Sequence, residues 1–240
     1  DASPPVVTIA TPRVTSNATV SISGSAADST GVTSLTVNGT PANTSNDYQN
    51  WQSPVIPLSP GWNHFMIAAS DMATPPNVSL VPHDIYQITT GSDADNDGLP
   101  DAWENTHGLD LFSATGNSGA LGDGDHDGIC NLLELAFGMD PARPDANKAP
   151  KVTIETNPAD GLDYLTVSHR RLINPGNLVY QIEVSNDCSA WTSESSRFEQ
   201  IGAPAGTRDG MTEIITVRVK PAINSAGHPG AYVRVKVSAP

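Results

Sequence analysis

Acidic residues recur at every second position in two short stretches near the middle of the chain. The first, DADNDGLPDAWE, runs from Asp93 to Glu104, and the second, DGDHDGICNLLE, runs from Asp123 to Glu134. In each stretch a glycine follows the third aspartate and a glutamate closes the pattern. Alternate side chains of a tight loop point inward, so their carboxylates converge on one point. Converging carboxylate oxygens bind hard cations, and this spacing predicts two calcium sites.

The first stretch fills every ligand position of an EF-hand calcium loop. Gly98 stands where that loop must turn sharply, and Pro100 stands at the start of the following helix, where its missing N–H is not needed. We expect this helix to return Glu104 to the loop as a bidentate ligand. The predicted ligands are Asp93, Asp95, Asp97, the carbonyl oxygen of Leu99, Asp101 and Glu104.

The second stretch fills the same positions with one difference. Asn131 stands where the first stretch has Asp101, so the second site has four acidic ligands where the first has five. We therefore expect it to bind calcium more weakly. His126 occupies a non-ligand position that should face solvent. The predicted ligands are Asp123, Asp125, Asp127, the carbonyl oxygen of Ile129, Asn131 and Glu134.

A disordered acidic linker is the alternative interpretation of these stretches. The apolar spacing after each loop instead favours short helices, over Leu99–Thr106 and Ile129–Phe137. Gly108 and Gly138 stand where helix-terminating glycines belong. Uncompensated carboxylates a few ångströms apart repel by about 1 kcal/mol per close pair even in water, so we expect the loops to need a cation in order to fold.

The sequence DADNDGLPDAWENTHGLD…GDGDHDGICNLLELAFGMDP, within residues 93–141, resembles the thrombospondin type 3 and dockerin-like calcium repeats. No EF-hand helix is expected before Asp93, because the preceding residues end a strand. In thrombospondin-like repeats the aspartate of the turn after the helix can help to bind calcium, which makes Asp110 and Asp140 secondary candidates. The dockerin resemblance implies a cohesin partner, but sandwiches on both sides would crowd the helix pair.

Residues 1–90 are predicted to form a β-sandwich, because short alternating segments are separated by turn clusters. The predicted strands are Val6–Ile9, Ala18–Ser23, Val32–Asn38, Ser53–Leu58, His64–Ala69 and Asp84–Thr89. We expect Trp51, Trp62, Phe65 and Tyr86 to be the large core residues. The succession of PPVVTIATP, ATVSISGSAADSTGVTSLTVNGTPA and VIPLSPGWNHFMIAASDMA resembles bacterial immunoglobulin-like domains, which implies a spacer or adhesive module.

Residues 149–240 are predicted to form a second sandwich, which follows a Pro-rich linker, Pro141–Pro150. The predicted strands are Lys151–Thr156, Leu162–Arg171, Leu178–Ser185, Arg197–Ile201, Met211–Lys220 and Ala231–Val237. The sequence LVYQIEVSNDCSAW resembles small C-terminal sandwiches of some large secreted bacterial proteins. The expected fold is mainly β, with two β-sandwiches joined by a two-calcium loop–helix unit over residues 91–148.

Negative charge is concentrated in that middle unit. The formal net charge is −14, and residues 91–150 hold twelve acids and two bases, a net charge of −10. A chain this acidic is not expected to bind nucleic acid or anionic membrane surfaces. No apolar run is long enough to span a membrane. Calcium loops of this kind suit the high calcium concentration outside cells, so we expect a secreted or cell-surface protein.

The remaining reactive residues form no catalytic pattern. Cys130 and Cys188 lie in different predicted domains, and either two free thiols or an interdomain disulfide is compatible with the sequence. The histidines show no HExxH motif or paired metal spacing, and the chain has no Gly-x-Ser-x-Gly elbow or phosphate loop. We therefore expect no enzymatic activity.

Two functions remain open at this level. The first is a structural or adhesive surface protein in which calcium makes the joint between the sandwiches rigid, with a surface polymer or a protein as its ligand. The end segments Pro4–Thr11 and Ala231–Ala239 are strand-like, so they could pair with a neighbouring subunit and build a filament. The alternative is a non-catalytic C-terminal appendage of a larger secreted enzyme, for example one that degrades polysaccharides.

Overall fold

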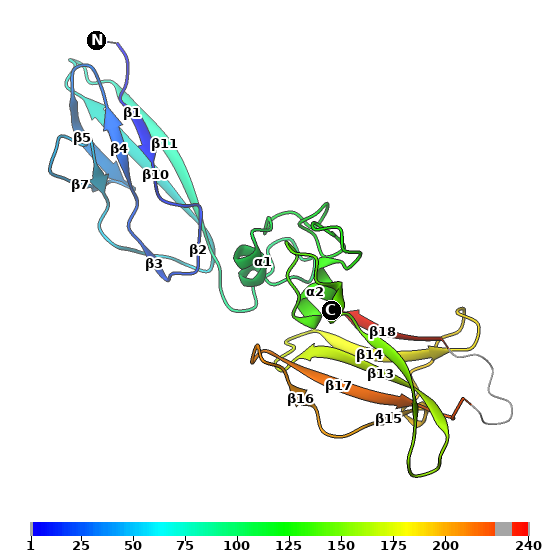
Figure 1. The fold of residues 1–240 in the computed structure, drawn as a ribbon. Coiled ribbons are helices and arrows are strands. Elements are labelled where there is room, and N and C mark those ends of the chain that lie inside the picture. The colour runs from blue at the N-terminus through cyan, green and yellow to red at the C-terminus, as the bar shows by residue number, and fades with distance from the viewer. Residues whose placement is uncertain (1, 224–231, 240) are drawn as a thin grey trace. The chain divides into compact units, whose positions relative to one another are not determined.

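The structure, a computed structural model, describes residues 2–223 and 232–239 (Figure 1). The chain divides into two compact units, Asp1–Ser92 and Asp93–Pro240. Most regular elements of the described residues are strands, so the predicted mainly β fold is confirmed. The loop–helix segment and the second sandwich, which the sequence presents as separate domains, belong to one compact unit.

Two main sheets form the first unit. One has the strand order β1–β4–β8–β7 and the other β2–β11–β10–β5–β6, while β3 and β9 form a separate short pair. The strands are β1 (Val6–Ile9), β2 (Val14–Thr15), β3 (Thr19–Val20), β4 (Ser23–Ala27), β5 (Val32–Val37), β6 (Thr40–Pro41), β7 (Asn43–Thr44), β8 (Trp51–Gln52), β9 (Ile56–Pro57), β10 (Gly61–Asp71) and β11 (Val78–Gln87). The long β10–β11 hairpin supplies most of the second sheet.

Side chains from both sheets meet in one hydrophobic core. Ala26 of β4 and Trp51 of β8 are buried against Phe65, Ile67 and Ala69 of β10. The three residues of β10 alternate with more exposed neighbours, as the period of two in a strand requires. Burial of this apolar surface holds the two sheets together.

The prediction of four large aromatic core residues is wrong for one of them. Trp51, Phe65 and Tyr86 are buried, but Trp62 is 48% exposed. Trp62 and Phe65 are an odd number of positions apart on β10, so their side chains leave opposite faces of the strand. Trp62 instead packs edge-on against Tyr86, with 5.2 Å between the ring centroids.

A five-stranded sheet and a two-stranded sheet build the sandwich of the second unit. Their orders are β12–β13–β17–β15, with β16 also paired to β17, and β14–β18. The strands are β12 (Lys151–Thr156), β13 (Asp163–Leu172), β14 (Val179–Ser185), β15 (Phe198–Gln200), β16 (Ala205–Gly206), β17 (Thr212–Val219) and β18 (Tyr232–Ser238), and a 3-10 helix η2 (Ser195–Arg197) precedes β15. Val167, Val184 and Val219 form the core between the sheets. Each predicted strand has a counterpart, although Ala231, the predicted start of the last one, lies outside the described residues.

Two short helices precede this sandwich within the same unit. α1 spans Asp101–His107 and α2 spans Asn131–Phe137, and both start slightly later than predicted. Each ends at a glycine in the left-handed conformation, Gly108 with φ 73° and Gly138 with φ 64°, as expected. In residues 2–223 and 232–239, no helix has the length and apolar character needed to cross a membrane.

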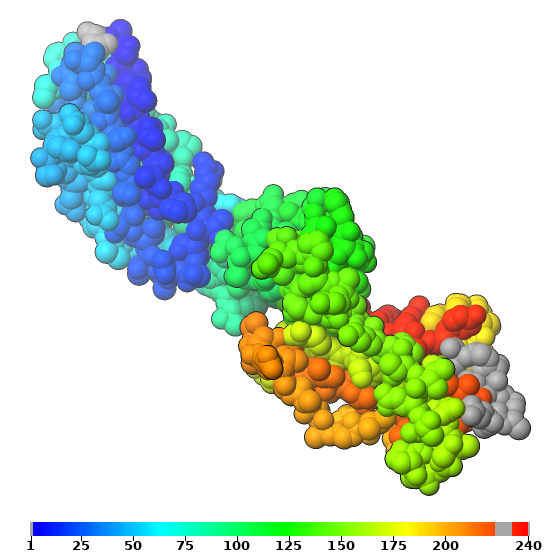
Figure 2. Space-filling view, viewed as in Figure 1, coloured from blue at the N-terminus to red at the C-terminus, as the bar shows by residue number. Residues whose placement is uncertain are grey.

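α2 packs against the sandwich through its last turn. Ala136 and Phe137 are buried in a cluster that includes Met139, Tyr180 of β14 and Val235 of β18. The Tyr180 hydroxyl donates a hydrogen bond of 2.6 Å to the carbonyl oxygen of Ala136. Figure 2 shows the green loop–helix segment directly against the strands coloured from yellow to red.

The Pro-rich stretch Pro141–Pro150 is not a free linker. A 3-10 helix, η1 (Ala146–Lys148), forms within it. The N–H of Asp145 donates a hydrogen bond of 2.8 Å to Oδ2 of Asp127 in the second acidic loop. Proline excludes regular backbone hydrogen bonding at its own nitrogen but does not prevent the stretch from packing on a neighbour.

The two strands nearest the chain ends lie at the edges of their sheets. Among the described strands, β1 pairs with β4 alone and β18 pairs with β14 alone. Each strand therefore has one edge without a partner in this part of the chain. Pairing of these edges with another subunit stays a prediction.

Candidate metal centres

Both acidic loops make the same backbone turn. Asn96 and His126, at equivalent positions, have positive φ angles of 60° and 63°. Gly98 and Gly128, two residues further on, have φ angles of 97° and 89°, which glycine adopts at little cost. His126 is exposed, as predicted for a residue outside the ligand set.

The aspartates of the first loop converge as their spacing predicts. One carboxylate oxygen from each of Asp93, Asp95 and Asp97 lies within 4.8 Å of the other two. The N–H of Gly98 donates to Oδ2 of Asp93 at 3.0 Å, and the N–H of Leu99 donates to Oδ1 of Asp97 at 2.8 Å. The turn thus fixes the carboxylates through its own backbone.

The second loop repeats this arrangement. Asp123, Asp125 and Asp127 bring one oxygen each within 4.8 Å of the others. The N–H of Gly128 donates to Oδ2 of Asp123 at 3.1 Å, and the N–H of Ile129 donates to Oδ1 of Asp127 at 2.9 Å. The two loops therefore share the spacing of their aspartates and these two backbone hydrogen bonds.

The helices α1 and α2 carry a buried glutamate to each loop. Glu104 is 0% exposed and Glu134 is 1% exposed. All four of their carboxylate oxygens are buried without a hydrogen-bond partner. Buried polar groups in proteins almost always have a partner, so these two side chains require an explanation.

The electrostatics of each site disfavour additional negative charge. Burial, followed by the charges of Asp95 and Asp97, raises the pKa of Glu104 to about 8. Burial, followed by the charges of Asp125 and Asp127, raises the pKa of Glu134 to about 8. An opposite charge among these carboxylates would favour their ionised forms.

The residues at the ninth loop position differ in their contacts. Asp101 is fully buried, and its Oδ1 accepts a hydrogen bond of 2.8 Å from the N–H of Ala94. Asn131 is also fully buried, and its Nδ2 donates to the carbonyl oxygens of Asn117 at 2.8 Å and Gly119 at 2.9 Å. These bonds leave Oδ1 of Asn131 buried without a partner.

The other predicted ligands are placed less directly. Leu99 is fully buried, and Ile129 packs against the buried cluster of α2. Coordination of an ion by the carbonyl oxygens of these two residues stays a prediction. Asp110 and Asp140 each accept an N–H from the residue two positions further on, at 3.2 Å in both cases. These local turn bonds give both aspartates a structural role.

Two further residues close the loops, and the sequence pattern does not reveal them. The N–H of Ala120 donates to Oδ2 of Asp97 at 2.6 Å, and the N–H of Asp145 donates to Oδ2 of Asp127 at 2.8 Å. Both donors lie in the segment that follows the helix of the same loop. Nothing in the sequence marks Ala120 for this role. Asp145 is acidic, but it lies in a Pro-rich stretch whose composition predicts a linker.

The interdomain disulfide is not formed. Cys130 and Cys188 are both free thiols. α2 contacts β14 near its start, at Leu178 and Tyr180, whereas Cys188 follows the far end of that strand. A strand rises about 3.3 Å per residue, so the length of β14 separates the contact from Cys188.

No family model matches the chain, and no curated protein matches it. The functional argument therefore depends on the geometry of these two sites.

Proposed function

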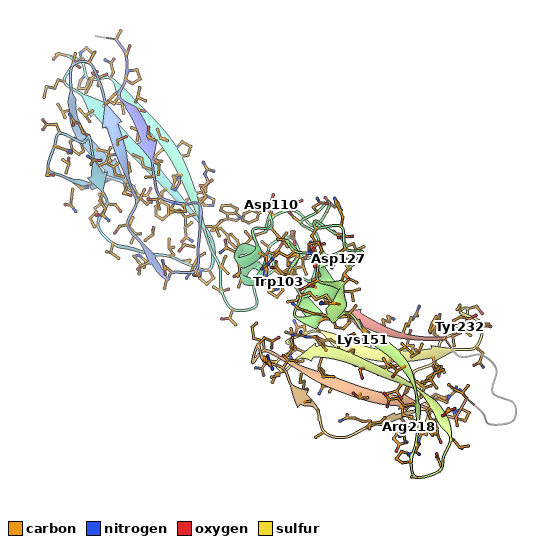
Figure 3. All side chains as sticks on the ribbon, in the orientation of Figure 1. Trp103, Asp110, Asp127, Lys151, Arg218 and Tyr232 are labelled. Carbon is orange, nitrogen blue, oxygen red and sulfur yellow. The ribbon has the colours of Figure 1, made fainter. Side chains whose placement is uncertain are left out.

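We propose that this is an extracellular calcium-binding structural protein with one calcium ion in each acidic loop. The first ion is held by Asp93, Asp95, Asp97, the carbonyl oxygen of Leu99, Asp101 and Glu104. The second is held by Asp123, Asp125, Asp127, the carbonyl oxygen of Ile129, Asn131 and Glu134. The loops lie at the labels Trp103 and Asp127 in Figure 3, within the second unit.

The observation that carries this proposal is the burial of Glu104 and Glu134 with all four oxygens unpartnered. Each lies at the end of a loop in which three aspartates already converge. An isolated buried carboxylate is strongly disfavoured, and its usual compensation is an ion pair or a metal ion. Among the residues that the structure describes, none forms a hydrogen bond or an ion pair with either glutamate carboxylate, so a cation fits the gap in both places.

The chemistry of the ligands favours calcium over other cations. Every side-chain ligand offers oxygen, and none offers sulfur or an imidazole nitrogen, which excludes the preferred ligands of zinc and copper. A bidentate glutamate and five other oxygen-bearing residues give a crowded, flexible shell of the kind that calcium accepts. Magnesium prefers a strict octahedron and keeps several waters, so it fits this set less well.

Calcium would stabilise the whole second unit through the helices. Ions in the loops offset the repulsion among the carboxylates and hold Glu104 and Glu134 in place. Glu134 lies on α2, whose Phe137 is buried against the sandwich strands. A loop that loses its ion would therefore loosen the contact between α2 and the sandwich, and a structural protein depends on that contact.

Isothermal titration calorimetry of chelated protein with calcium chloride tests the binding. We expect two ions per chain, and one ion per chain in each of the variants Glu104→Gln and Glu134→Gln. Glu194→Gln is the control, because Glu194 is exposed and remote in sequence from both loops. An unmodified protein that takes up no calcium would falsify the proposal.

Electron microscopy tests the structural role separately. We expect calcium-loaded protein to form filaments that dissolve on chelation, through the free edges of β1 and β18. Monomers at every concentration, together with normal calcium binding, would remove the filament and leave the calcium sites intact.

A further inference from the structure

The two calcium loops are not equivalent at their ninth position. Asp101 supplies a carboxylate there, but Asn131 supplies a neutral amide. The amide nitrogen of Asn131 holds two backbone carbonyls of the preceding segment, those of Asn117 and Gly119. A carboxylate cannot donate, so an aspartate at this position would face two carbonyl oxygens without a proton to share. The second loop therefore cannot place its fifth negative charge where the first loop does.

The segment that returns after α2 brings a carboxylate to the same loop. The N–H of Ala120 closes the first loop on Asp97, and the N–H of Asp145 closes the second loop on Asp127. The two donors thus occupy equivalent places. Alanine brings no ligand atom to the first loop, whereas Asp145 brings a side chain with two oxygens to the second.

The side chain of Asp145 has one committed oxygen and one free oxygen. Its Oδ2 forms an ion pair with Nζ of Lys148 at 2.5 Å. Its Oδ1 is buried without a hydrogen-bond partner, and the side chain as a whole is only 16% exposed. The hydrogen bond from the N–H of Asp145 to Oδ2 of Asp127 places this residue beside the ligand set.

We propose that Oδ1 of Asp145 is a direct ligand of the second calcium ion, with Lys148 as the positioning residue that holds Oδ2 away from the ion. This inference rests on the proposed calcium function. Asp145 supplies the fifth carboxylate that Asn131 withholds, so both sites have five. The second site then binds calcium at least as tightly as the first, in contrast to the expectation from the loop sequence alone.

Calorimetry on single-site proteins tests this assignment. The Glu104→Gln protein retains only the second site. In that background, Asp145→Asn should raise the Kd for calcium, titrated as calcium chloride, at least about tenfold. Glu194→Gln is the control, because it removes one negative charge at an exposed position remote in sequence from the second loop; its Kd should stay within about twofold of the parent. Lys148→Met should weaken binding less than Asp145→Asn, and Lys148→Arg should restore it.

The outcomes separate this inference from the proposed function. If the Glu104→Gln protein binds no calcium, the proposed function itself fails at this loop. If it binds calcium and Asp145→Asn leaves the Kd unchanged, Asp145 is not a ligand. If the Asp145→Asn protein does not fold, a comparison of the two single-site proteins still tests the assignment, because neither of them alters Asp145. The Kd of the Glu104→Gln protein should be equal to or lower than that of Glu134→Gln, and a clearly weaker second site would overturn the assignment.

Discussion

Gly98 and Gly128 have the same left-handed backbone conformation in two different surroundings. Both have a left-handed φ that a side chain adopts only at a cost. A Cβ added to Gly98 would lie 2.7 Å from Cβ of Ala239, whereas a Cβ added to Gly128 would meet no atom of the described residues within 4 Å. The first acidic loop thus lies against the segment that follows β18, and within the described residues the second loop has no such contact at its glycine.

Gly98→Ala should destabilise the second unit more than Gly128→Ala. Both variants incur about 1–2 kcal/mol of backbone strain, and only Gly98→Ala adds a steric clash, worth roughly 1 kcal/mol or more. Thermal unfolding in saturating calcium measures the difference. Adding Ala239→Gly to the Gly98→Ala variant should reduce its loss of stability to that of Gly128→Ala. Equal losses of stability in Gly98→Ala and Gly128→Ala would show that the contact with Ala239 does not matter.

At the residue scale, the sequence predicts what the loop itself determines. The convergence of Asp93, Asp95 and Asp97 follows from alternate spacing around a glycine, so the pattern alone is sufficient. The contribution of Asp145 depends on the path of the chain after α2, which local spacing does not encode. The orientation of Asn131 is likewise fixed by carbonyl groups that precede the loop.

An aromatic cluster joins α2 to the two sheets of the second unit. The rings of Phe137 of α2, His169 of β13 and Tyr180 of β14 form a triangle, with centroid distances of 6.4 Å from Phe137 to each of the others and 6.2 Å between His169 and Tyr180. Nδ1 of His169 donates to the carbonyl oxygen of Arg170 at 2.9 Å, because a carbonyl can only accept. Burial lowers the pKa of His169 from 6.5, and the charge of Arg171 lowers it further against that hydrogen bond.

Protonation of His169 in this cluster should make the second unit less stable in mild acid. The pKa of His169 is lower in the folded protein, so the unfolded chain binds the proton more tightly. The stability contributed by neutral His169 is present above pH 6.5 and is lost as the pH falls through the folded value. Chemical unfolding at several pH values should show a smaller loss for His169→Phe than for the unmodified protein. The carboxylates are the same in both proteins, so identical slopes would mean that folding does not lower the pKa of His169.

At the element scale, periodicity finds the strands and helices but not their surroundings. β12, β13 and β17 begin within a few residues of the predicted positions, and both helix-ending glycines are where they were expected. Trp62 shows the limit, since hydrophobicity suggests burial while its position on β10 points it outward. The Pro-rich stretch shows another, because its order comes from contact with a distant loop.

On the scale of the whole molecule, charge separates the two units. The first unit, Asp1–Ser92, holds five acids and one base, for a net charge of −4. The second, Asp93–Pro240, carries the remaining −10 and contains both acidic loops. The repulsion among the loop carboxylates, which a cation would relieve, is therefore confined to the second unit. The core of the first unit contains none of these carboxylates.

Chelation should lower the stability of the second unit alone. Differential scanning calorimetry of the full chain should show two transitions, of which one moves to lower temperature when EGTA replaces calcium. At free calcium a hundredfold above Kd, each site contributes about 2.7 kcal/mol. The Glu134→Gln variant identifies the transition that belongs to the second unit. Equal shifts of both transitions would mean that the units do not unfold independently.

The closing N–H groups give the loop–helix repeat a modular organisation. Ala120 closes the first loop and lies just before the second loop, and Asp145 closes the second loop and lies just before β12. Each loop is thus completed by chain that follows its own helix. A tandem duplication of one loop, helix and return segment would carry its closing donor with it. Evolution could therefore change the number of repeats in whole steps without redesigning either sandwich.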